Sequence, residues 1–178
     1  MDFITYTISA FIAFSGIFIG LLLAKTAPDE VHSFKKYIPS SQLILTIVSF
    51  LILFLYIDFL ISGLVFILSF AFIFLFWQKR DINVLDYIVF SIIIVIASTN
   101  LTAHYYFTSV LFVFGVLSGS LFYVLHDKPT KKKILHHKHS GKQLTFNEMS
   151  LLLFRKYLFF FIFAIVNFII AQIMLVLI

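Results

Sequence analysis

The chain has no cysteine and few charged residues. Without cysteine it forms neither disulfides nor thiolate metal sites, and thiol chemistry is excluded. Charged residues make up 12% of its 178 residues, whereas they are about a quarter of a soluble domain. Hydrophobic residues make up 62%, and the mean hydropathy is +1.09, so polar side chains are too few to cover a water-soluble fold. The composition predicts an all-α protein that crosses a membrane several times.

The sequence also lacks the signatures of common enzyme classes. It contains no nucleophile elbow, no HExxH helix and no Walker loop. No charged residue lies near the middle of a long apolar run, which argues against a proton or sodium pump built on a buried carboxylate. We therefore predict no cofactor and no bound metal, and we favour a non-enzymatic role.

Long apolar runs separated by polar connections make up most of the chain. An α-helix rises 1.5 Å per residue, so about 20 residues cross the hydrocarbon core of a bilayer. The runs predict one membrane domain over residues 1–178, a six-transmembrane-helix bundle with spans at about 3–24, 41–57, 60–77, 82–99, 103–125 and 157–178. The fourth run reaches a sufficient length only if it includes Asp86, and we prefer that longer helix.

The first connection is expected to hold a short helix in the membrane interface. Thr26 and Asp29 have the spacing of a capping box, and Pro28 suits a first helical turn. Pro39 is expected to end this helix. Over residues 28–38 three apolar side chains then share one face, as in a helix that lies on a membrane: Val31, Phe34 and Ile38.

Two segments are similar to small uncharacterised archaeal multi-pass membrane proteins. One is GLLLAKTAPDEVHSFKKY, residues 20–37, which resembles the A-P-E-E and K-K-Y segment after their first helix. Asp29 stands where that pattern has Glu, and the usual Pro-Gly before Lys35 is missing. The other is FVFGVLSGSL, residues 112–121, which resembles their F-x-x-G-x-x-x-G-S stretch. The segments cover less than a fifth of the chain, and the resemblance implies no particular activity.

Four of the six glycines form two GxxxG pairs in predicted spans. The pairs are Gly16 with Gly20 and Gly115 with Gly119. Small residues at such spacing let helix backbones approach closely. In the first span they belong to a longer stripe of small residues: Ser9, Ala13, Gly16, Gly20 and Ala24. We predict that the first and fifth spans pack in parallel through these glycines, in the inner half of the bilayer.

The basic residues predict the orientation of the chain. All thirteen Lys and Arg residues lie in or beside the first, third and fifth connections. The positive-inside rule places these connections in the cytoplasm. We therefore predict a multi-pass protein of the cell (cytoplasmic) membrane with both termini outside. The same asymmetry accounts for the net charge of +5, so we expect no nucleic-acid partner.

The longest polar stretch is a basic cytoplasmic loop over residues 126–156. It holds eight of the thirteen Lys and Arg residues and four of the six histidines. Lysines beside a membrane helix attract anionic lipid by about 1 kcal/mol per charge. The clustered histidines lack the carboxylates that a metal site needs. Thr145 and Glu148 are expected to form a capping box that opens the last helix. We predict that anionic headgroups contact four lysines: Lys131, Lys132, Lys133 and Lys138.

Three polar residues in the predicted spans are candidate ligand positions. Asp86 lies about one turn inside the inner boundary, where we favour pairing with Arg80 or a loop lysine over a substrate site. Asn167 and Gln172 fall near mid-bilayer in the last span. We favour interhelical hydrogen bonds for them, each worth about 0.6 to 2 kcal/mol, over the lining of a ligand site.

Three functional hypotheses remain open. The leading hypothesis is a non-enzymatic scaffold or accessory subunit of a membrane complex, whose partners are lipids and either another membrane protein or a second copy of the chain. The second is a small transporter or ligand-capture subunit with a site at Asn167, Gln172 and the serines of the fifth span. The third is a lipid-modifying enzyme that uses the histidines and lysines of the basic loop at the cytoplasmic face.

Overall fold

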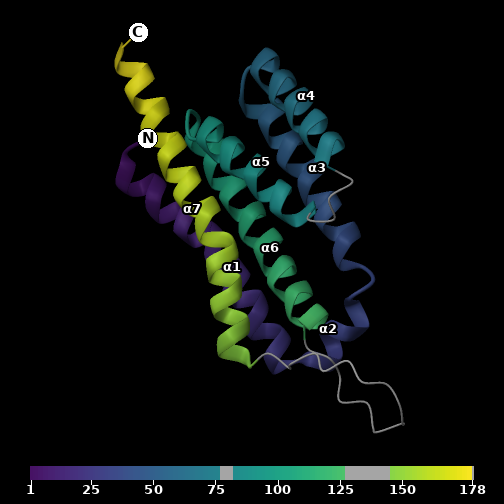
Figure 1. Ribbon diagram of the computed structural model, residues 1–178. Helices are drawn as coiled ribbons and strands as arrows, with labels where there is room; N and C mark the ends of the chain where they lie inside the picture. Colours follow the sequence, from purple (N-terminus) through teal and green to yellow (C-terminus); the bar gives the residue numbers. More distant parts are fainter. Residues whose placement is uncertain (77–81, 127–144, 178) are drawn as a thin grey trace, which may run out of the picture.

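The chain folds as a bundle of α-helices (Figure 1). The computed structural model describes residues 1–76, 82–126 and 145–177, with the backbone alone at 68–76, 82–88, 156, 159, 160 and 174–177. The described part forms seven helices: α1 (Phe3–Thr26), α2 (Pro28–Phe34), α3 (Ile38–Tyr56), α4 (Phe59–Phe76), α5 (Ile82–Ala97), α6 (Leu101–His126) and α7 (Phe146–Leu177). The predicted all-α class is confirmed.

Three helices of the described part are long and apolar enough to cross a membrane: α1, α3 and α6. They contain 24, 19 and 26 residues, which correspond to roughly 28 to 39 Å at 1.5 Å per residue. A shorter apolar segment, Phe161–Ile173, lies within α7. Helix α5 has 16 residues and is about 24 Å long, less than the hydrocarbon thickness of about 30 Å.

The two ends of the bundle collect different connections. Figure 1 shows both termini at the same end as the turns that follow α3 and α5, whereas α2 and the end of α6 lie at the opposite end. Asn100 joins the two turns. Its Oδ1 accepts hydrogen bonds from the backbone N–H groups of Thr102 and Ala103, at 3.0 and 3.2 Å, as a helix cap. Its Nδ2 donates to the Tyr56 carbonyl at 3.1 Å.

Within the described part of the chain, helix α1 packs against α6 more extensively than any other pair of helices does. At Gly20 an added Cβ would lie 2.7 Å from the carbonyl carbon of Val116, and at Gly119 it would lie 2.9 Å from that of Ile17. Because real Cβ atoms essentially never approach backbone so closely, these positions require glycine. The helices are parallel, since Tyr6 lies beside His104 while Gly20 lies beside Val116 further along both.

The small-residue stripe of α1 is buried along its whole length. Ser9 is 7% exposed, and the later members of the stripe are buried as well. The opposite face carries large apolar side chains such as Ile4 and Phe11, which are 68% and 64% exposed. Small residues therefore face the protein and large apolar ones face outward, an arrangement typical of membrane helices.

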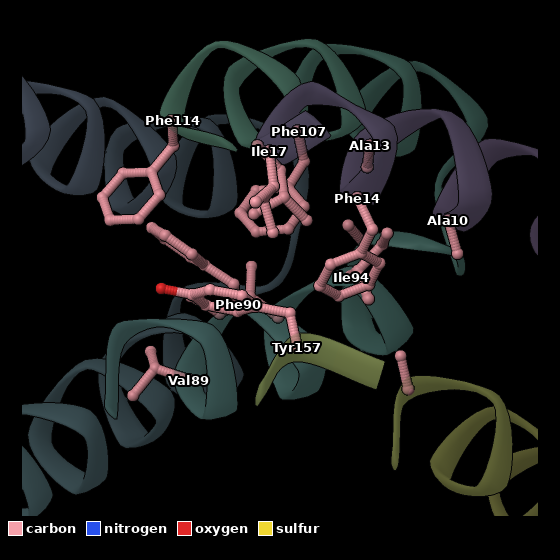
Figure 2. Close-up of a cluster of buried hydrophobic side chains, with 14 of the residues drawn as sticks. Ala10, Ala13, Phe14, Ile17, Val89, Phe90, Ile94, Phe107, Phe114 and Tyr157 are labelled. Carbon is pink, nitrogen blue, oxygen red and sulfur yellow. The ribbon is translucent and has the colours of Figure 1, made fainter. Parts of the chain in front are cut away.

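Aromatic side chains fill the space between α1, α5, α6 and α7. Phe90 of α5 lies at the centre (Figure 2), with its ring centroid 5.8 Å from that of Phe107 and 4.8 Å from that of Phe114, both in edge-to-face geometry. Tyr157 of α7 and Phe14 of α1 complete this cluster. In a bilayer, lipid tails are as apolar as these rings, so close packing rather than escape from water holds them together.

The predicted caps have mixed outcomes. The capping box at Thr145 and Glu148 is confirmed: the Thr145 N–H donates to Glu148 Oε2 at 2.7 Å, and the Glu148 N–H donates to Thr145 Oγ1 at 3.3 Å. The box predicted at Thr26 and Asp29 is wrong. Thr26 ends α1, where its hydroxyl donates to the Leu23 carbonyl at 2.9 Å, and α2 has no side-chain cap.

The role predicted for Pro39 is also wrong. It lies in the first turn of α3 and does not end α2. A proline suits the first turn of a helix because the N–H that it lacks has no helical partner there. Asp2 caps α1, with Oδ2 accepting from the Thr5 N–H at 3.1 Å. Hydrogen bonds from the side chain and backbone of Thr5 hold the pKa of Asp2 below its usual range.

Alanine substitutions test the backbone contact between α1 and α6. We expect Gly20→Ala and Gly119→Ala to lower the free energy of unfolding by about 1 to 3 kcal/mol, the usual cost of overpacking. Gly115→Ala should cost less, because its added Cβ would meet its nearest atom, the Ile17 nitrogen, at 3.0 Å. Thermal unfolding in detergent micelles measures the series.

Gly63→Ala is the matched control, because a Cβ there meets nothing within 4 Å. It should keep or raise the melting temperature, since alanine is the better helix former. Wild-type melting of Gly20→Ala and Gly119→Ala would contradict the contact.

Candidate functional site

A buried cluster of rings joins three helices near the termini. Tyr6 of α1, His104 of α6 and Phe168 of α7 are each at most 1% exposed. The Tyr6 ring stacks on Phe168 with centroids 3.9 Å apart and lies 5.7 Å from the His104 ring. The Tyr6 hydroxyl donates to the Ala164 carbonyl at 3.1 Å. The cluster therefore combines an aromatic stack with one interhelical hydrogen bond.

His104 is the chemically unusual member of this cluster. Its ring lies beside the backbone carbonyl of Ile94, but neither ring nitrogen makes a hydrogen bond of acceptable geometry within the described part of the chain. Leaving a buried polar group unpaired costs about 1 to 3 kcal/mol. A neutral imidazole offers one donor and one acceptor, so a water molecule or a small polar ligand is the chemical class that would satisfy it.

Two other buried polar side chains of the described interior form hydrogen bonds between helices. Gln42 of α3 donates from Nε2 to Ser118 Oγ of α6 at 2.9 Å. The Ser120 hydroxyl donates to the Gly20 carbonyl at 3.0 Å, beside the glycine contact. Such bonds stabilise helix association in membranes by about 0.6 to 2 kcal/mol each. The sequence reasoning missed Gln42 and Tyr6. Neither stands out in the sequence, because Gln42 follows Ser40 and Ser41, and Tyr6 lies between Thr5 and Thr7.

The structure shows no hydrogen bond from Asn167 or Gln172 to another helix among the described residues. Asn167 Nδ2 donates to the Phe163 carbonyl of its own helix at 2.9 Å. Gln172 follows Phe168 by one turn but is exposed. Phe168 already packs beside Phe3, the first residue of α1, with centroids 6.2 Å apart. Gln172 therefore lies beyond the start of α1, where the C-terminal end of α7 projects past its neighbours (Figure 1).

The remaining candidate residues are only partly placed. Asp86 is the fifth residue of α5, but its side chain lies outside the described part. The four loop lysines and the clustered loop histidines fall in residues 127–144, which are also outside it. The structure brings the two GxxxG pairs together at the α1–α6 contact. Across the described ranges, no group of three or more His, Cys, Asp or Glu side chains is arranged to hold a metal.

Replacing His104 tests whether its ring nitrogens are unpaired. We expect His104→Leu to raise the free energy of unfolding by about 1 kcal/mol, because it removes an unsatisfied buried polar group. Tyr6→Phe is the matched control in the same cluster. It should lower that free energy by about 1 kcal/mol, because it removes the bond to Ala164. Thermal unfolding in detergent measures both variants. If His104→Leu lowers the free energy of unfolding more than Tyr6→Phe does, the imidazole has a bound partner.

No protein-family model, curated protein or solved structure matches this chain. The inference of function therefore starts from the geometry described above. Its main elements are the α1–α6 backbone contact, the polar bonds that join the helices, the buried ring cluster and the exposed apolar faces.

Proposed function

We propose that the protein is a six-span membrane protein that acts as a non-enzymatic scaffold or accessory subunit of a membrane complex. The observation that carries the proposal is a tightly packed interior combined with extensive outward apolar faces. Residues such as Phe11 on α1, Leu51 on α3 and Ile170 on α7 are each more than half exposed. Soluble monomers rarely expose continuous apolar surface on this scale. In a bilayer these faces contact lipid or the helix of a partner.

The proposed orientation places α2 in the cytoplasm and both termini outside. Helix α2 and the turn after it carry Lys35 and Lys36, at the end of the bundle opposite the termini (Figure 1). At the end of the bundle where the termini lie, the connecting segments carry Asp2 and Asp58 but no lysine or arginine. Basic residues favour the cytoplasmic side, so the difference between the ends supports this orientation.

A static scaffold agrees better with the described interior than a transporter does. The α1 and α6 backbones meet without room for a side chain at Gly20 and Gly119. The buried polar groups of Gln42 and Tyr6 are used in bonds between helices. Asn167 bonds within its own helix and so does not favour the ligand site that the transporter hypothesis placed there.

Cysteine labelling tests the orientation without background, because the natural chain has no cysteine. Thr102→Cys and Ser33→Cys replace exposed residues at opposite ends of the bundle. We expect a membrane-impermeant maleimide to label Thr102→Cys in intact cells, and to label Ser33→Cys only after permeabilisation. Labelling of Ser33→Cys in intact cells would contradict the orientation. The cysteine-free parent chain is the control for background labelling.

Tryptophan substitution on the outward faces tests the accessory role. After extraction in mild detergent, we expect the tagged chain to be retained in a complex of fixed stoichiometry. Tryptophan at one of Ile8, Ile47 or Ile170, which lie on α1, α3 and α7, should disrupt that complex, because a larger side chain is tolerated against lipid but not in a packed interface. Melting of the isolated chain should stay unchanged. If the wild-type chain migrates without partners after extraction in several mild detergents, the accessory role is contradicted.

A further inference from the structure

A groove lies between the α2–α3 turn and the C-terminal end of α6. Its volume is about 540 Å³, within the range of roughly 300 to 1,000 Å³ found for small-molecule sites. The α2 side is polar and basic, and the α6 side is apolar. Seven residues line these two walls: His32, Ser33, Lys35, Lys36 and Pro39 on one side, and Leu121 and Leu125 on the other. We name it the α2–α6 groove.

The walls of the α2–α6 groove are held by the main helix contact. The Ser120 hydroxyl, next to Leu121 in the chain, donates to the Gly20 carbonyl at 3.0 Å. Only Ala27 separates α1 from α2, and α2 itself contacts α6. The turn after α2 is closed by a hydrogen bond from the Tyr37 N–H to the Phe34 carbonyl at 2.8 Å. The spacing between the basic and apolar walls is therefore set in advance of any ligand.

The basic wall favours an anion. Lys35 and Lys36 are adjacent and exposed, and no acidic side chain is among the residues that line the groove. Lys36 Nζ lies 4.8 Å from the centroid of the Tyr37 ring, a contact that restricts the position of the ammonium group. Neighbouring cations in a concave site concentrate anions.

The apolar wall and the surroundings favour a phospholipid over a soluble anion. Leu125 is 57% exposed and continues the outward apolar surface of α6. Phe34 and Tyr37, beside the basic wall, are 62% and 54% exposed, as is typical of aromatic residues at the membrane interface. Free phosphate would use the lysines and leave the leucines uncovered. A phospholipid contacts both walls at once.

We propose that the α2–α6 groove binds the headgroup phosphate of an anionic phospholipid in the cytoplasmic leaflet. Lys35 and Lys36 hold the phosphate, and the first part of an acyl chain lies along Leu121 and Leu125. This assignment rests on the proposed membrane orientation, which places α2 at the cytoplasmic face. It differs from the diffuse attraction expected at the basic loop because it requires one shaped site.

Thermal unfolding of the full chain with added lipid tests the groove. In detergent, phosphatidylglycerol should raise the melting temperature of the wild-type chain more than phosphatidylcholine does. Native mass spectrometry should show that the variant Lys35→Gln/Lys36→Gln binds phosphatidylglycerol about thirtyfold more weakly. This factor follows from a loss of about 1 kcal/mol of binding free energy for each lysine. The melting temperature of this variant in phosphatidylcholine should equal that of the wild type, which shows that it folds.

Lys128→Gln/Lys142→Gln is the matched control, because it removes the same charge from the basic loop at two lysines outside the four that are predicted to contact headgroups. Its affinity for phosphatidylglycerol should stay within about threefold of that of the wild type, a smaller loss than removal of one lysine from the groove would cause. Equal losses in the two double variants would overturn the site in favour of diffuse charge attraction. No loss in Lys35→Gln/Lys36→Gln would overturn it outright.

A third variant separates the lipid from a soluble anion. Leu125→Gln should weaken phosphatidylglycerol binding severalfold while leaving both lysines in place. Inorganic phosphate should stabilise the wild-type chain no more than chloride does at equal ionic strength. Stabilisation by phosphate equal to that by phosphatidylglycerol would overturn the lipid assignment. If cysteine labelling supports the orientation and these lipid tests fail, the lipid site in the α2–α6 groove is wrong and the proposed orientation stands.

Discussion

The close contact between the α1 and α6 backbones determines where most other parts of the structure lie. At Gly16, Gly20 and Gly119 no side chain fits between the helices, so their register admits little sliding or rotation. In a membrane, lipid tails are as apolar as leucine, and association depends on such close packing and on a few interhelical hydrogen bonds. The same register brings Tyr6 beside His104 at one end and Ala27 with α2 beside α6 at the other.

The polar atoms of the interior support this arrangement instead of competing with it. Ser120 bonds to Gly20, Gln42 to Ser118, and Tyr6 to Ala164, so α1, α3, α6 and α7 are joined by single bonds at different depths. Each bond ties a side chain to a particular neighbouring helix, which packing among similar apolar residues does not do. His104 is the exception, because its ring is fully buried beside this network.

Some of these features could be predicted from sequence and others could not. The GxxxG pairs, the small stripe of α1 and the capping box at Thr145 depend on local spacing, and spacing is visible in one sequence. The roles of Gln42 and Gln172 depend on helix rotation and on how far α7 extends past α1, which are tertiary properties. Pro39 was misassigned because a proline marks a helix boundary without saying which helix it belongs to. The six-span count stays a prediction, since three helices of the described part have the required length and composition.

The rigidity of the α1–α6 contact also limits where function can reside. Rotating α6 against α1 would drive the Ile17 and Val116 carbonyls into side chains of the opposite helix, because only glycine is accommodated at Gly119 and Gly20. A mechanism that needs these helices to move apart would also lose the hydrogen bond from Ser120 to the Gly20 carbonyl. Binding is therefore easier to achieve at surfaces that the contact positions but does not include. The outward apolar faces and the α2–α6 groove are such surfaces, and both can change occupants without altering the packed interior.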